Sequence, residues 1–86
     1  MAPEDPHILV VDDHRDIRES LAQFLRKNGR RATAVENAEA ARKAIKENRI
    51  DLVILDIMMP GEDGLSLCRP IREANHIPVI LLSARA

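Results

Sequence analysis

Apolar and polar residues alternate along the chain in blocks that predict strands and helices in turn. Two short apolar runs, His7–Val11 (HILVV) and residues 78–82 (PVILL), have the length and composition of strands. Residues 51–56 (DLVILD) are continuously apolar between two aspartates, which is typical of a strand buried on both faces of a parallel sheet. Arg31–Val35 (RATAV) is a weaker strand pattern.

Helical spacing of apolar residues predicts helices between these strands. The first covers residues 16–28, and Gly29 is placed to end it in a left-handed conformation. Asn37 is a suitable N-cap for a second helix over residues 38–48, and a third is predicted over residues 64–75. The apolar face expected for the first helix consists of Ile17, Leu21, Phe24 and Leu25.

The predicted order is β-α-β-α-β-α-β with short connections. Such alternation favours an α/β fold, with a parallel sheet covered by helices on both faces and joined by right-handed crossovers. We expect one domain over residues 1–86, of which residues 1–6 form an N-terminal tail.

The composition argues against several classes of protein. The 86 residues are 45% hydrophobic and 31% charged with a formal net charge of −1, which gives no indication of a nucleic-acid or membrane surface. Neither a signal peptide nor an apolar run of about 20 residues is present, so a cytoplasmic location is the default expectation. Cys68 is the single cysteine, which excludes an intrachain disulfide.

Aspartates follow two of the predicted strands. Asp12 and Asp13 come directly after ILVV, and Asp56 comes directly after LVIL. If these strands are parallel neighbours, three carboxylates meet at one edge of the sheet, where they repel one another and need a cation or a proton. Carboxylates, backbone carbonyls and water are the ligands that suit Mg²⁺.

A structural role for these aspartates is the alternative. Asp13 or Asp16 would then cap the first helix, and Asp56 would only begin a turn. The histidines, His7, His14 and His76, have no metal-ligand spacing, and we expect His14 to be a solvated loop residue.

Three segments together carry a family resemblance. ILVVDD, DLVILDIMMPGEDGL and IPVILLSA resemble, in order and spacing, the receiver domain of bacterial two-component response regulators. The resemblance implies a flavodoxin-like fold with strand order 2-1-3-4-5, here expected as four strands in the order 2-1-3-4 with three helices.

The resemblance also implies roles for individual residues. Asp56 would accept a phosphoryl group from a phosphohistidine on a sensor histidine kinase or phosphotransfer protein, and Ser83 would hydrogen-bond that group. Mg²⁺ would be held by Asp13 directly, by Asp12 largely through water, and by Asp56 and the Met58 carbonyl. Such a chain is a phosphoacceptor that assists its own phosphorylation rather than a dedicated enzyme.

The family pattern continues beyond the residues present, so we expect a truncated receiver domain. The last strand and helices are missing, and none of the three lysines, Lys27, Lys43 and Lys46, follows Asp56 to serve as the family's phosphate-pairing lysine. Phosphoryl transfer should therefore be slow, and the usual output face should not switch. An uncovered fourth strand also predicts a homodimer or higher oligomer.

Three other function classes are alternatives. A structural or interaction fragment that self-associates through the fourth strand would keep the motifs without switching. Haloacid-dehalogenase-type phosphatases use a strand-end aspartate with Mg²⁺ but resemble Asp-x-Asp, whereas this chain has Asp12-Asp13-His14. A nucleotide-binding protein would require a phosphate-binding glycine loop that the chain lacks.

Overall fold

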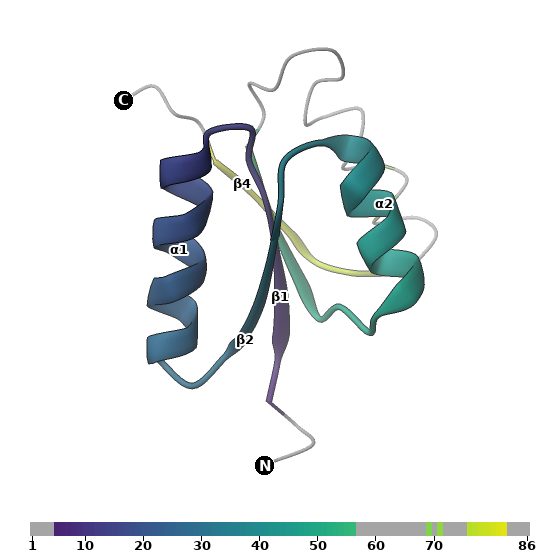
Figure 1. Ribbon diagram of the computed structural model, residues 1–86. Coiled ribbons are helices and arrows are strands. Elements are labelled where there is room, and N and C mark those ends of the chain that lie inside the picture. The colour runs from purple at the N-terminus through teal and green to yellow at the C-terminus, as the bar shows by residue number, and fades with distance from the viewer. Residues whose placement is uncertain (1–4, 57–68, 70, 72–75, 83–86) are drawn as a thin grey trace.

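The computed structural model describes residues 5–56, 69, 71 and 76–82. The described elements are β1 (His7–Val11), α1 (Arg15–Lys27), β2 (Arg31–Val35), α2 (Ala38–Glu47), β3 (Leu52–Asp56) and β4 (Val79–Leu82). All four strands are parallel, in the order β2-β1-β3-β4, which confirms the predicted fold class (Figure 1). Of the helix predicted over residues 64–75, only Arg69 and Ile71 are described, and both are helical.

Local sequence explains where the described helices begin and end. The side chain of Asn37 accepts a hydrogen bond from the backbone N–H of Ala40 at 2.8 Å, which caps α2 as predicted. Gly29 follows α1 with φ +80, the left-handed conformation that favours glycine. Both helices lie within one residue of their predicted bounds.

The sheet separates two apolar clusters, because alternate residues of a strand face opposite sides. In β1, Ile8 and Val10 pack on the side of α1 with Leu25, whereas Leu9 and Val11 pack on the side of α2. The cluster on the α2 side is larger and includes alanines of α2 and residues of β3. Its members are Leu9, Val11, Ala38, Ala41, Ala44, Ile50, Val53, Leu55, Ile71 and Ile77.

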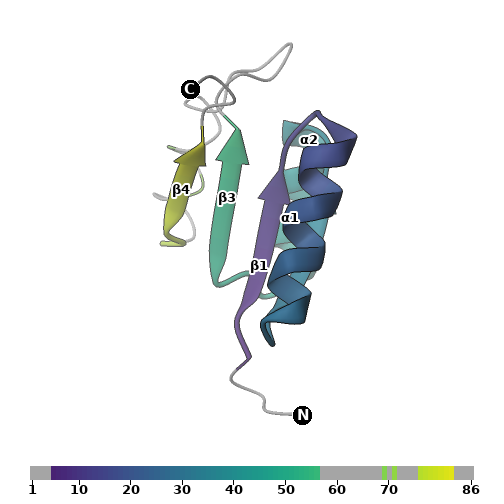
Figure 2. The same cartoon turned by 90° about the vertical axis from the view of Figure 1, so that its left-hand side faces the viewer.

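Half of the sheet carries no described helix on the α1 side. Figure 2 shows α1 beside β1, on the side away from β3, while β3 and β4 face the viewer without a described helix over them. The apolar face predicted for α1 is therefore only partly buried: Leu25 is buried, but Ile17 and Phe24 are exposed, Phe24 by 61%.

No described helix is long and apolar enough to cross a membrane.

His7 joins three segments at the amino ends of the strands. Its backbone N–H donates to Asp51 Oδ2 at 2.9 Å, and its ring Nε2 lies 2.7 Å from Thr33 Oγ1. Burial lowers the pKa of His7 below its ordinary value of 6.5, Arg31 lowers the pKa further, and Asp51 opposes this shift. The fold therefore favours the neutral ring.

We predict that His7 makes the protein less stable in mild acid. The unfolded chain takes up a proton on His7 near pH 6.5, while the folded chain does so only at lower pH, so the free energy of unfolding falls as pH decreases through that window. Urea unfolding at about pH 7.5 and about pH 5.5 measures this loss. The loss should be smaller in His7→Asn than in wild type and unchanged in the control His76→Asn; equal losses in all three would contradict the prediction.

Candidate functional site

The carboxyl end of β1 brings Asp12 to the rim of the sheet and then turns the chain into α1. The backbone N–H of Asp12 donates to the Val35 carbonyl at 3.1 Å, which extends the pairing of β1 with β2 by one residue. Asp12 Oδ1 then accepts a hydrogen bond from the His14 backbone N–H at 2.8 Å, as in an Asx turn. This turn fixes the Asp12 side chain above the strand end.

The alternative in which an aspartate caps α1 is wrong. His14 occupies the N-cap position, and no side chain caps the helix there. Asp13 and Asp16 are therefore not needed to start the helix.

The register of the sheet places Asp56 beside this turn. Val11 pairs with Leu55, so the next residues of the two parallel strands, Asp12 and Asp56, lie side by side at the same edge. Both are buried, Asp12 with 6% and Asp56 with 2% of its surface exposed. The predicted convergence of strand-end carboxylates is therefore present.

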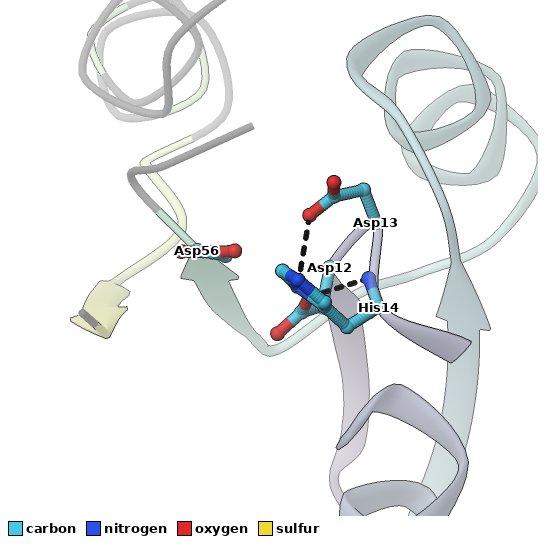
Figure 3. A group of neighbouring side chains, drawn as sticks. All are labelled: Asp12, Asp13, His14 and Asp56. Carbon is cyan, nitrogen blue, oxygen red and sulfur yellow. Dashed lines mark hydrogen bonds and ion pairs between the residues drawn. The ribbon is translucent and has the colours of Figure 1, made fainter. Parts of the chain in front are cut away.

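Asp12, Asp13, His14 and Asp56 form what we call the rim cluster. Each offers a side-chain ligand atom, and these four atoms all lie within 4.8 Å of one another (Figure 3). Carboxylate oxygens so close together in a partly buried site repel strongly unless a cation or proton is shared among them. The donor set fits a divalent cation.

An orphaned oxygen supports the same conclusion. Asp13 Oδ1 is buried and accepts no hydrogen bond from the described residues, although His14 Nδ1 lies 3.2 Å away. Buried polar atoms are nearly always hydrogen-bonded or bound to an ion, so this oxygen is available to a ligand.

His14 differs from the sequence-based expectation. The side chain is 56% exposed, as expected for a loop residue, yet its Nδ1 turns inward to within 3.3 Å of Asp12 Oδ1 and 3.2 Å of Asp13 Oδ1. The sequence signal for this inward contact was the position of His14 directly after the two aspartates. Which way the ring turns depends on the loop conformation, which spacing does not reveal.

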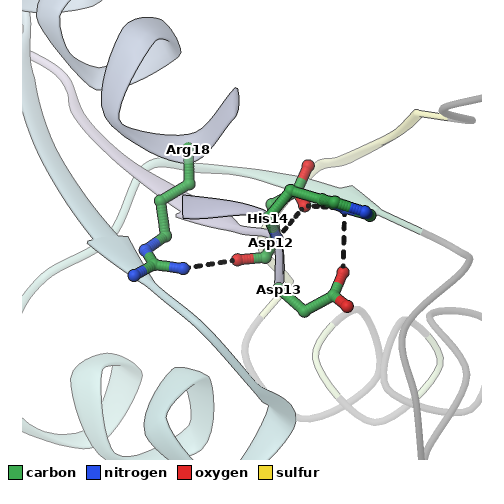
Figure 4. Close-up of polar contacts among 4 residues, drawn as sticks. All are labelled: Asp12, Asp13, His14 and Arg18. Carbon is green, nitrogen blue, oxygen red and sulfur yellow. Dashed lines mark hydrogen bonds and ion pairs between the residues drawn. The ribbon is translucent and has the colours of Figure 1, made fainter. Parts of the chain in front are cut away.

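Arg18 supports the loop from the first turns of α1. Its Nη1 donates to the Asp12 backbone carbonyl at 3.2 Å (Figure 4). The guanidinium therefore stabilises the loop backbone and leaves the Asp12 side chain to the rim cluster.

Two predicted site residues, Ser83 and Met58, lie outside the described residues. Their predicted roles, a hydrogen bond to a phosphoryl group and a carbonyl ligand to Mg²⁺, stay predictions. The three aspartates of the predicted site are all described and all lie in the rim cluster.

The comparisons with known proteins all indicate the same family. The family model of the response regulator receiver domain matches residues 8–86. PetR of Rhodobacter capsulatus is 46% identical over 99% of this chain and 36% of its own length. The transcriptional regulatory protein CseB of Streptomyces avermitilis is 45% identical over 96% of this chain and 35% of its own length. The chain thus spans about a third of the length of these curated relatives.

Solved structures agree with the sequence relatives. A response regulator receiver protein from Pseudomonas putida has a TM-score of 0.87 at 36% identity, covering 95% of this chain and 70% of that one. TrrA of Thermotoga maritima, solved in complex with Mg(2+)-BeF, has a TM-score of 0.86 at 43% identity, covering 94% and 71%. TrrA has also been solved in complex with the histidine kinase ThkA.

Crowding of carboxylates in the rim cluster predicts a stability gain on neutralising one of them. In EDTA, Asp56→Asn should raise the free energy of unfolding by about 1 kcal/mol or more, because one of three mutually repelling charges is removed. Urea unfolding measures the change. Glu19→Gln, which neutralises an exposed carboxylate on α1, is the matched control and should change stability by less than about 0.5 kcal/mol. An Asp56→Asn protein no more stable than wild type would contradict the repulsion argument.

Proposed function

Because the chain belongs to the response regulator receiver domain family, we propose that it accepts a phosphoryl group on Asp56 in two-component signalling. The observation that carries the proposal is the position of Asp56. It is buried at the end of β3, with side-chain ligand atoms of Asp12 and Asp13 within 4.8 Å. A carboxylate is a competent nucleophile for phosphoryl transfer, and a nearby cluster of acidic oxygens is suited to the metal ion that such transfer needs.

Phosphoryl transfer forms one bond to phosphorus and breaks another. A carboxylate oxygen of Asp56 forms a P–O bond while the P–N bond of a donor phosphohistidine breaks, and the electron pair returns to the imidazole nitrogen, which then takes a proton. The product is an aspartyl phosphate on Asp56. Ser83 is proposed to hydrogen-bond the phosphoryl group, because the resemblance places it at the end of the neighbouring strand.

Mg²⁺ is the proposed cofactor. Asp13 would hold the ion directly, Asp12 largely through water, and Asp56 and the Met58 carbonyl would complete the protein ligands. Asp12 Oδ1 already accepts a hydrogen bond from the His14 backbone N–H, which is consistent with its less direct role. When bound, the ion would neutralise negative charge on the transferring group. The complex of TrrA with Mg(2+)-BeF supports this choice of metal.

The proposed partner is a sensor histidine kinase or phosphotransfer protein, in the cytoplasm. The complex of TrrA with the histidine kinase ThkA supports this class of partner. A net charge of −1 gives no reason to propose direct nucleic-acid binding by these 86 residues. We propose that the chain is a phosphoacceptor and not a dedicated enzyme.

Phosphorylation provides the direct test. After incubation with Mg²⁺ and a small-molecule phosphodonor such as acetyl phosphate, intact mass spectrometry should show one phosphoryl adduct. EDTA should abolish the adduct, and so should Asp56→Asn, whereas Asp51→Asn at the opposite end of β3 should retain it. No adduct on a folded protein, or an equal adduct on Asp56→Asn, would refute acceptance at Asp56.

A second candidate function rests on exposed apolar surface. Ile80, Leu81 and Leu82 of β4 are each at least 39% exposed, and β4 is the last strand on its side of the described sheet. A groove of about 540 Å³ between α1 and β4 is lined by Ile17, Leu21, Phe24 and Leu82, with Asp16 and Ser20. Such a surface favours a non-switching interaction fragment that self-associates through β4.

We predict that self-association depends on the exposed face of β4. Sedimentation equilibrium at tens of micromolar protein should show a homodimer or a higher oligomer, and Ile80→Lys should shift it toward monomer because a charge would be buried in the contact. Gln23→Lys adds the same charge to an exposed position of α1 and should leave the association unchanged. A monomeric wild-type protein across that range would exclude this second candidate.

A further inference from the structure

Arg18 contacts the loop that carries Asp12 and Asp13 at two points. The loop, residues 12–14, connects the end of β1 to the start of α1. The backbone N–H of Arg18 donates to the His14 carbonyl at 3.0 Å, and its side-chain Nη1 donates to the Asp12 carbonyl at 3.2 Å (Figure 4). Neither the receiver resemblance nor the function proposed above assigns a role to this side chain.

The Asp12 carbonyl belongs to the peptide unit that joins Asp12 to Asp13. This unit is planar, so a group that fixes the direction of its carbonyl also fixes the backbone from which both side chains extend. A hydrogen bond from a guanidinium is charge-assisted and therefore stronger than one from a neutral donor. Water would also satisfy the carbonyl, but water would not tie it to α1.

Two other hydrogen bonds hold the loop on either side of this peptide unit. The Asp12 N–H donates to the Val35 carbonyl, and the His14 N–H donates to Asp12 Oδ1. Arg18 adds the constraint between these two bonds. Asp13 depends on it most, because its buried Oδ1 accepts no hydrogen bond from the described residues and its position is therefore set by the backbone.

We propose that Arg18 is a positioning residue for the Mg²⁺ site. Its bond to the Asp12 carbonyl holds the peptide unit in the orientation that lets the carboxylates of Asp12 and Asp13 serve one ion. The inference rests on the proposed function, which assigns Mg²⁺ to these carboxylates. Without the bond, the metal-free loop samples other orientations, and the affinity for Mg²⁺ falls with the fraction of the competent one.

The direction of the effect separates this role from two others. A positive charge repels a cation, so if charge alone mattered, removing the guanidinium would strengthen Mg²⁺ binding. If the bond only tethered α1 to the loop, its loss would lower the stability of the protein and leave the Mg²⁺ affinity unchanged. The positioning role predicts weaker Mg²⁺ binding.

A Mg²⁺ titration of the full chain, followed by backbone amide resonances, tests the assignment. Arg18→Met keeps an apolar stem and removes the guanidinium, and it should weaken Mg²⁺ binding by about tenfold, as expected when a partner of a metal ligand is lost. Arg18→Lys keeps a charged donor and should recover part of the affinity. Arg26→Met is the matched control, because Arg26 also lies on α1 and donates to a backbone carbonyl, that of Ala32, at 2.9 Å. Its Mg²⁺ affinity should equal that of wild type.

A second variant protects the test against a folding defect. Arg18→Ala removes the same hydrogen bond with the residue of highest helix propensity, and it should lose the same Mg²⁺ affinity. Urea unfolding in EDTA establishes that each variant is folded. Mg²⁺ binding as tight as wild type, or tighter, in either folded variant would overturn the positioning role.

Phosphorylation provides a further readout. With acetyl phosphate as donor, the Mg²⁺ concentration that gives half of the maximal rate of adduct formation should rise in Arg18→Met by the same factor as the affinity falls. The rate at saturating Mg²⁺ should match wild type, because Arg18 bonds to the loop backbone and is not a member of the rim cluster. A lower saturated rate with an unchanged Mg²⁺ dependence would contradict the proposal.

The two proposals fail separately. An adduct on wild type, together with equal Mg²⁺ affinity in wild type and Arg18→Met, would overturn the positioning role and keep the receiver function. Mg²⁺ binding that depends on Arg18, in a protein that forms no adduct, would keep the positioning role and remove the receiver function. A wild-type protein that binds no Mg²⁺ at the rim cluster would overturn both the positioning role and the proposed cofactor.

Discussion

The parallel pairing of β1 with β3 is the constraint on which the site depends. The two strands run in the same direction with Val11 opposite Leu55, so each strand delivers its next residue to one edge of the sheet. Those residues are Asp12 and Asp56, and both are buried. A shift of one residue in this register would separate the carboxylates and turn the apolar residues of β3 to the wrong faces. The core and the site are therefore fixed by the same pairing.

This arrangement concentrates charge where the fold can least solvate it. Val10, Val11, Val53 and Leu55 are almost fully buried below the rim, and the aspartates sit directly above them. Charge repulsion is expected to oppose folding there, and a bound cation or the neutralisation of one carboxylate would relieve it. A phosphoryl group on Asp56 would add about 1.5 to 2 further negative charges at the same place. Metal binding and phosphorylation at the rim cluster, both proposed above, would therefore act on the same crowded charges.

The strand-end aspartates and the limits of the helices were predictable from the sequence, because both depend on short local patterns. Strand-end placement of Asp12, Asp13 and Asp56 follows from the apolar runs before them, and parallel strands bring their carboxyl ends together. Helix limits followed from Asn37 and Gly29, whose roles are local. The orientation of His14 was missed because it depends on a turn closed by the Asp12 side chain. The exposure of Phe24 was missed because helical spacing identifies an apolar face without showing how much of the sheet lies beneath it.

The central claim is that the carboxylates of the rim cluster bind a divalent cation where phosphoryl transfer would occur. A Mg²⁺ titration followed by backbone amide resonances tests it most directly. The account predicts saturable shifts at the amides of Asp12, Asp13, His14 and Asp56, with little change at Asp51 and His7 at the opposite edge of the sheet. Shifts that do not saturate, or that are spread evenly over both edges, would contradict it.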